Sequence, residues 1–171
     1  RLIAQGRRAV VLGREIGQGL ITLVKKMGVH ENADIDLAMA KVDAWLIKEV
    51  ARHVDREDRQ EAARDKAECL RVLADMLPET KRQVSDLFTT IERIFSDEQV
   101  AGGITLSTVH KSKGLEWDDV TILDWAKMPA QWARRDWQRK QEVHCAYVAV
   151  TRARERLILC DAEDFEPKDA S

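Results

Sequence analysis

The most restrictive feature of this sequence is a polar loop, residues 108–120, that lies between two strand-like runs. The run before it, residues 104–107, is β-branched and alternating, and the run at its end, residues 120–123, is continuously apolar, as is typical of buried parallel strands. Open α/β sheets bind ligands at loops that follow such strands. This loop carries cationic, hydroxyl and carboxylate side chains, which suit phosphates and sugar hydroxyls, so the sequence indicates a nucleotide or a nucleic acid as ligand.

Three other segments predict the rest of an α/β fold. Residues 8–12 form a short apolar run, and residues 15–27 follow it with apolar side chains at helical spacing. A second helical pattern begins at Pro129 and leads to a final strand. We therefore expect parallel strands near residues 8–12, 104–109, 119–124 and 156–160.

The middle of the chain has only helical patterns. Three apolar stripes recur at helical spacing: residues 35, 39, 42, 46, 50 and 54, then 67, 70, 73 and 77, then 84, 87, 88, 91, 94 and 95. Residues 80–83 fit a capping box, which predicts the start of the third helix there. We expect a helical insertion over 29–98, inside a domain made of 1–28 and 99–161, with a tail over 162–171.

Charge and composition exclude several classes of protein. The net charge of −2 argues against a surface that binds polyanions over its whole extent; residues 29–98 hold 11 basic and 17 acidic side chains, so a nucleic-acid groove should lie on the flanks. No apolar run approaches the roughly 20 residues of a membrane span and no secretory leader is visible, so we expect a cytoplasmic protein without membrane contact. The three cysteines have no C-x-x-C spacing, which predicts reduced thiols and no metal site.

Two motifs in this sequence resemble a known family. Residues 108–120, T-x-H-x-x-K-G-L-E-W-x-x-V, resemble motif V of the UvrD/Rep-type superfamily 1 DNA helicases, and residues 147–153, Y-V-A-V-T-R-A, resemble their motif VI. Each motif stands beside an apolar strand, in the family's order. The chain is thus similar to the C-terminal, second RecA-like domain of such a helicase, which implies an incomplete RecA-like parallel sheet with a helical insertion.

The resemblance assigns roles in ATP hydrolysis to four residues. Arg152 matches the arginine finger, which stabilises charge on the γ-phosphate, although a helix dipole would also favour an arginine there. Glu116 matches the glutamate that binds the nucleotide ribose, or else is an ordinary loop carboxylate. Gly114 would let the loop approach a phosphate, and Lys113 would neutralise phosphate charge or serve an interdomain contact.

A second group of loop residues matches positions that face single-stranded DNA in the family. Thr108 and His110 would donate to phosphate oxygens without reading bases, and Lys111 would add electrostatic attraction. The alternative for His110 is a hydrogen-bonded loop histidine. Tyr147 and Trp117 are expected to pack rather than to stack on bases.

Two parts of an ATPase do not occur in the sequence. It has no G-x-x-x-x-G-K-[ST] loop for the phosphates and no strand that ends in an Asp-Glu pair for Mg²⁺. We therefore expect the C-terminal part of an ATP-dependent, 3′→5′ DNA helicase or translocase, inactive alone, with ATP and Mg²⁺ held mainly by a missing N-terminal ATPase domain of the same protein. The alternatives are a non-catalytic remnant that binds DNA or a partner, and part of a recombination helicase-nuclease.

Overall fold

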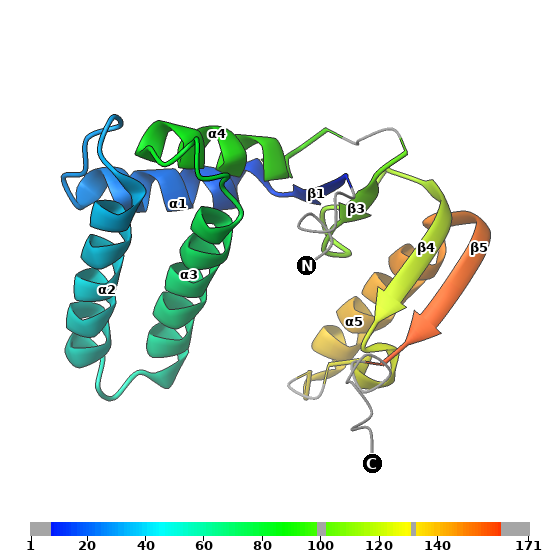
Figure 1. The fold of residues 1–171 in the computed structure, drawn as a ribbon. Coiled ribbons are helices and arrows are strands. Elements are labelled where there is room, and N and C mark those ends of the chain that lie inside the picture. Colours follow the sequence, from blue (N-terminus) through cyan, green and yellow to red (C-terminus); the bar gives the residue numbers. More distant parts are fainter. Residues whose placement is uncertain (1–7, 99–101, 131–132, 162–171) are drawn as a thin grey trace, which may run out of the picture. The chain divides into compact units, whose positions relative to one another are not determined.

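The computed structural model describes residues 8–98, 102–130 and 133–161, so the predicted tail lies outside the described residues. The described residues contain five α-helices and five short strands, all paired in parallel, which confirms the mixed α/β class with a helical segment between strands (Figure 1). The chain divides into two compact units, Arg1–Leu106 and Ser107–Ser171, called unit 1 and unit 2 below.

The sheet of unit 1 is centred on β1 (Ala9–Leu12). It pairs in parallel with β3 (Ile104–Leu106), as predicted, and with β2 (Phe95–Ser96). The sequence analysis missed β2, because Phe95 continues an apolar stripe at helical spacing. The helix ends at Phe95. The Phe95 backbone N–H still donates to the Ile91 carbonyl, and the Phe95 side chain is buried.

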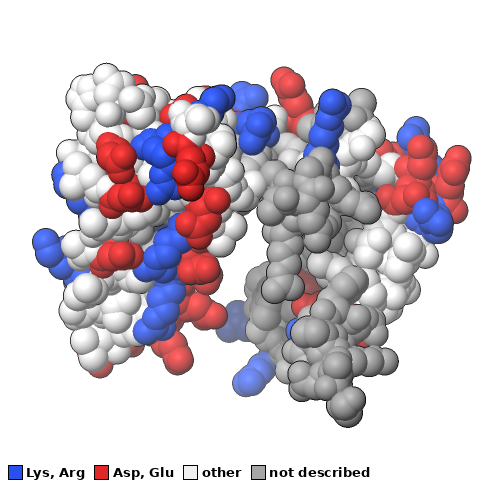
Figure 2. Space-filling model, in the orientation of Figure 1, with Lys and Arg blue, Asp and Glu red and all other residues white. Residues whose placement is uncertain are grey.

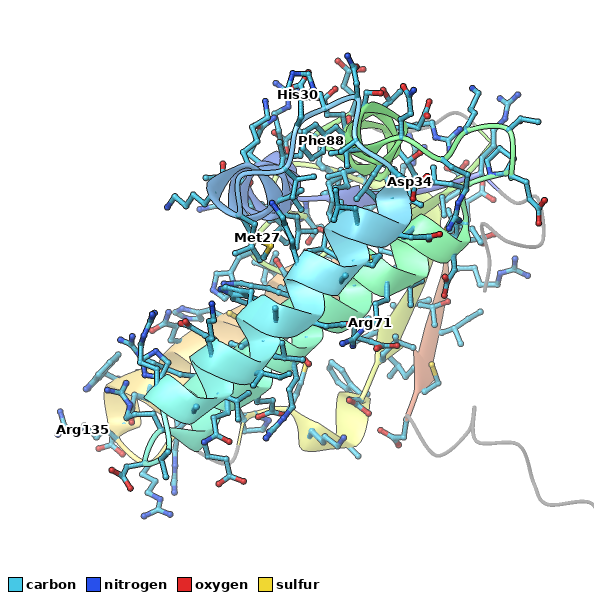
Figure 3. The ribbon with its side chains drawn as sticks, turned by 60° about the vertical axis from the view of Figure 1, so that its left-hand side comes forward. Met27, His30, Asp34, Arg71, Phe88 and Arg135 are labelled. Carbon is cyan, nitrogen blue, oxygen red and sulfur yellow. The ribbon has the colours of Figure 1, made fainter. Side chains whose placement is uncertain are left out.

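The helices of unit 1 are α1 (Arg14–Lys26), α2 (Ile35–Arg52), α3 (Glu57–Asp75) and α4 (Val84–Ile94). α2 and α3 lie side by side as a hairpin (Figure 1). Acidic and basic side chains are interleaved over this hairpin (Figure 2). Asp34 caps α2: its Oδ1 accepts a hydrogen bond of 2.7 Å from the backbone N–H of Asp36 (Figure 3).

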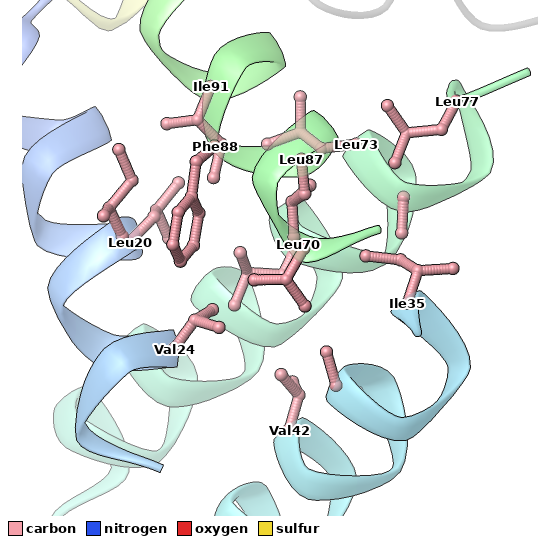
Figure 4. Close-up of a cluster of buried hydrophobic side chains, with 14 of the residues drawn as sticks. Leu20, Val24, Ile35, Val42, Leu70, Leu73, Leu77, Leu87, Phe88 and Ile91 are labelled. Carbon is pink, nitrogen blue, oxygen red and sulfur yellow. The ribbon is translucent and has the colours of Figure 1, made fainter. Parts of the chain in front are cut away.

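One hydrophobic core joins these four helices (Figure 4). The second and third predicted stripes are entirely buried, whereas the first loses contact toward its end, where Val54 is 72% exposed. Gly17 allows α1 to approach α4 closely: a Cβ added there would lie 2.8 Å from the Cβ of Phe95. The fully buried side chains of greatest volume are Ile35, Leu70, Leu87, Ile91, Val10, Val24, Val42 and Val84.

The predicted start of the third helix is wrong by several residues, because α4 begins only at Val84. Gln83 is instead extended and forms an isolated antiparallel bridge with Asp34. The Ile35 backbone N–H donates to the Arg82 carbonyl at 2.9 Å. The Gln83 N–H donates to the Asp86 carboxylate at 3.2 Å, so the cap of α4 lies three residues after the predicted one.

Unit 2 is a strand–helix–strand unit. Its strands β4 (Trp117–Leu123) and β5 (Ala153–Cys160) pair in parallel and both begin before their predicted first residues. Between them lie a 3₁₀ turn, η1 (Trp125–Lys127), and α5 (Asp136–Val150). A helical crossover of this kind is the usual connection between adjacent parallel strands.

Two ion pairs cross from β4 to β5. Arg154 Nη2 lies 2.7 Å from Asp118 Oδ1, and Arg156 donates to both oxygens of Asp119 at 2.9 and 2.7 Å. These ion pairs connect the first residues of β4 with the first residues of β5. Among the described residues, no helix is long and apolar enough to span a bilayer.

Candidate functional site

The loop before β4, residues 108–116, is held in a defined shape by its own hydrogen bonds; we call it the motif V loop. The Ser112 N–H donates to the Thr108 carbonyl at 3.0 Å, and the Leu115 N–H donates to the Ser112 carbonyl at 3.0 Å. Ser112 is 6% exposed, and its hydroxyl donates to Val109 O at 2.8 Å. The sequence analysis gave Ser112 no role, although Ser112 is buried and forms three of the hydrogen bonds within this loop.

The motif V loop contacts α5 and the residues that follow it at two points. Near the loop's start, His110 Nε2 lies 3.6 Å from Cys145 Sγ. At its end, Arg152 Nη1 donates to the Leu115 carbonyl at 2.8 Å, and the Trp117 N–H donates to the Arg152 carbonyl at 3.0 Å. The first contact point is on α5, and the second is just after its end at Val150.

Arg152 is half-buried, and three of its N–H groups have acceptors. Besides the bond to Leu115, Nε donates to the Val148 carbonyl and Nη2 to the Thr151 hydroxyl, both at 3.0 Å. A guanidinium has five N–H donors, so two remain for a further acceptor. The bond to Val148 also caps the C-terminal end of α5. The helix dipole therefore explains part of why an arginine is found at this position.

Three predicted nucleotide-binding residues lie on the exposed side of the same loop. Glu116 follows Leu115 directly, so its backbone is one residue from the carbonyl that Arg152 contacts. The side chains of Glu116 and Lys113 are exposed and have no hydrogen-bond or ion-pair partner within the described ranges. Gly114 has φ +85° with open space where a Cβ would be, which is the conformation that glycine adopts at least cost.

The three predicted DNA-binding residues, Thr108, His110 and Lys111, are all exposed near the start of the loop. The Thr108 hydroxyl accepts a hydrogen bond of 3.3 Å from the Lys111 N–H and keeps its own proton for another acceptor. The contact with Cys145 orients the His110 ring against α5. Unit 2 therefore contains both predicted groups, one near each end of a single loop.

Three further side chains lie in or near the two motifs. The Glu142 Oε2 accepts from the Ala130 N–H at 3.2 Å and holds the segment before α5. Tyr147 is 67% exposed, so the expectation that it packs is wrong for the described residues. Trp117 does pack, and its indole N–H is buried without a partner among the described atoms.

Within residues 8–98, 102–130 and 133–161, no cluster of three or more His, Cys, Asp or Glu side chains could hold a metal ion. The polar groups that are present suit the edge of a nucleotide: a carboxylate that accepts from ribose hydroxyls, a lysine, and an arginine with two N–H groups remaining. Acidic ligands for Mg²⁺ are not gathered in these ranges.

Comparisons with known proteins agree with the motifs. The sequence model of a family described as UvrD-like helicase C-terminal domain matches residues 25–164. The chain is also similar to F-box DNA helicase protein 1 of Schizosaccharomyces pombe (strain 972 / ATCC 24843), with 42% identity over 66 residues. That similarity covers 34% of this chain and 7% of the relative's length.

Proposed function

Because the chain belongs to the family of UvrD-like helicase C-terminal domains, we propose that it is the C-terminal part of an ATP-dependent DNA helicase or translocase. In this proposal, Arg152 and Glu116 complete an ATP site whose phosphate-binding loop and Mg²⁺ ligands belong to an N-terminal ATPase domain of the same protein. Thr108, His110 and Lys111 contact single-stranded DNA. Travel in the 3′→5′ direction is part of the proposal and follows from the resemblance alone.

The observation that best supports this function is the way Arg152 is held. Three hydrogen bonds fix the guanidinium beside the end of the motif V loop, one residue from Glu116, and two N–H groups remain. A guanidinium that is already oriented can stabilise charge on a phosphate without further reorganisation. Glu116 supplies a carboxylate that accepts from ribose hydroxyls, and Lys113 neutralises phosphate charge.

The same contacts suggest how nucleotide and DNA are coupled. The DNA-binding residues are near the loop end that contacts Cys145, and the nucleotide-binding residues are near the loop end that contacts Arg152. Any movement that closes Arg152 onto a nucleotide would therefore carry His110 with it. Repeated closing and opening would move the DNA-contacting residues along the strand.

The proposal is tested by replacing Arg152 with alanine in the full-length protein. We expect ATP turnover in the presence of single-stranded DNA to fall about 10³-fold or more, as for other arginine fingers. Arg152→Lys should restore little of it, because an ammonium group lacks the two-pronged donor geometry. Arg154→Ala is the matched control: it removes an exposed arginine two residues away and should leave turnover near the parental value. Parental turnover in Arg152→Ala would remove this residue from the mechanism.

A further inference from the structure

One face of α5 combines exposed aromatic and basic side chains. Trp137 is 59% exposed and Tyr147 is 67% exposed, and Lys140 and His144 between them are exposed as well. These residues follow one another at spacings of three, four and three, which places them on one side of the helix. We call this set, Trp137, Lys140, His144 and Tyr147, the α5 face.

Cations at the start of α5 have no acidic partner in the described ranges. Arg134 and Arg135 precede the helix and are exposed, and like Lys140 they form no ion pair there. By contrast, Arg154 and Arg156 in the same unit are both paired with aspartates. Basic groups at a helix N-terminus oppose the helix dipole, so this arrangement does not help the helix itself.

α5 itself has only two acidic residues. Glu142 is engaged with the backbone of Ala130, and Asp136 is exposed in the first turn. Single exposed apolar residues are ordinary on protein surfaces. Two exposed aromatic rings with unpaired cations beside them are instead the composition of a surface that holds single-stranded nucleic acid, where bases stack on rings and cations follow the phosphates.

The motif V loop contacts the same helix. Cys145, whose sulfur contacts His110, follows His144 in sequence and lies about 100° around the helix from it. Trp137 and Tyr147 are ten residues apart, about 15 Å along the helix. That length corresponds to about four stacked nucleotides.

We propose that the α5 face is a second contact for single-stranded DNA, on the same helix that His110 contacts. Bases stack on Trp137 and Tyr147, while Lys140 and the arginines before α5 contact phosphates. Stacking of this kind tolerates any base sequence, as a translocating protein requires. This inference rests on the proposed DNA contact of the motif V loop.

The test measures the affinity of this 171-residue chain for a dye-labelled oligothymidine by fluorescence anisotropy at low salt. Trp137→Ala should weaken binding about tenfold, within the range seen for loss of one stacked base, whereas Trp137→Phe should stay close to the parent. Ile47→Ala, which alters a side chain on α2 that is 71% exposed, is the matched control and should have no effect. A circular dichroism spectrum of each variant verifies that the chain is folded.

Salt dependence provides an independent readout. Lys140→Gln should lower the slope of log affinity against log salt by about one unit, because one phosphate contact is lost. Lys48→Gln, a charge-matched change at an exposed position on α2, should leave the slope unchanged.

Variants of the loop separate this inference from the proposed function. If Thr108→Ala and His110→Ala weaken binding but Trp137→Ala does not, the α5 face is not a DNA contact and the loop proposal stands. If only Trp137→Ala weakens binding, the α5 face is confirmed and the loop assignment fails. Absence of any binding by the parent chain would overturn the inference, as would a Trp137→Ala variant that loses association with the N-terminal ATPase domain while DNA affinity is unchanged.

Discussion

The two units of this molecule differ in where their apolar side chains lie. Of the 24 buried hydrophobic residues in the described ranges, 21 belong to unit 1 and only Ile122, Ala133 and Ala149 belong to unit 2. In unit 2, the strand residues Leu123 and Leu159 are 59% and 44% exposed. All the residues predicted to bind nucleotide or DNA are nevertheless in unit 2.

This contrast indicates that stability and function are separated along the chain. Unit 1 is a packed helical core, so changes there should alter the free energy of unfolding. Unit 2 orients its candidate site with hydrogen bonds, so changes to the site residues should alter ligand affinity and turnover with little effect on unfolding. The predictions below test that separation.

The largest effect on stability is expected from a cavity in unit 1. Leu70 is fully buried in the core, so Leu70→Ala should lower the free energy of unfolding by about 3 kcal/mol. Urea titration followed by far-ultraviolet circular dichroism reports on this change, because four of the five α-helices described lie in unit 1. Leu37→Ala, at a position that is 53% exposed on α2, should change it by less than about 0.5 kcal/mol. Equal losses in the two variants would contradict the core assignment.

A smaller loss is expected where α1 packs on α4. The added methyl of Gly17→Ala would lie 2.8 Å from the Cβ of Phe95 and 3.2 Å from Ile91 Cγ2, so we expect destabilisation by about 2 kcal/mol through overpacking. Gly19, in the same helix, has nothing within 4 Å of an added Cβ, and Gly19→Ala should stabilise by roughly 1 kcal/mol. The same urea titration measures both. Two shifts of the same sign would show that the close approach of the helices is not what requires Gly17.

Features that depend on local pattern could be predicted from the sequence. The stripe of Leu70, Leu73 and Leu77 recurs at helical spacing and is buried as expected. The continuous apolar run at 120–123 falls in β4, and residues 108–116 of motif V form the loop before this parallel strand. These predictions succeeded because helix and strand periodicity report directly on which side chains face a core.

Features that depend on pairing between distant segments could not be predicted in this way. Phe95 continues a helical stripe but belongs to a strand, because it pairs with Val11 of β1. α4 begins after Gln83, which pairs with the distant Asp34, and not after Thr80 as the local pattern predicts. The hydrogen bond from Arg152 to Leu115 joins residues that are 37 apart in the sequence. This bond shows how the guanidinium is held, which the motif sequence alone does not.

The smallest effect on stability is expected from the ion pair between Asp119 and Arg156. Both side chains are more than half exposed, so the urea midpoint of Asp119→Asn should be indistinguishable from that of the parent. ATP turnover of the full-length variant should also remain near parental, because Arg152 is anchored separately through Leu115. Asp118→Asn, which removes the neighbouring pair with Arg154, provides a second measurement of the same kind. A strong loss of turnover at an unchanged midpoint would mean that pairing of β4 with β5 positions Arg152, and the site would then depend on the sheet of unit 2 as well as on the loop.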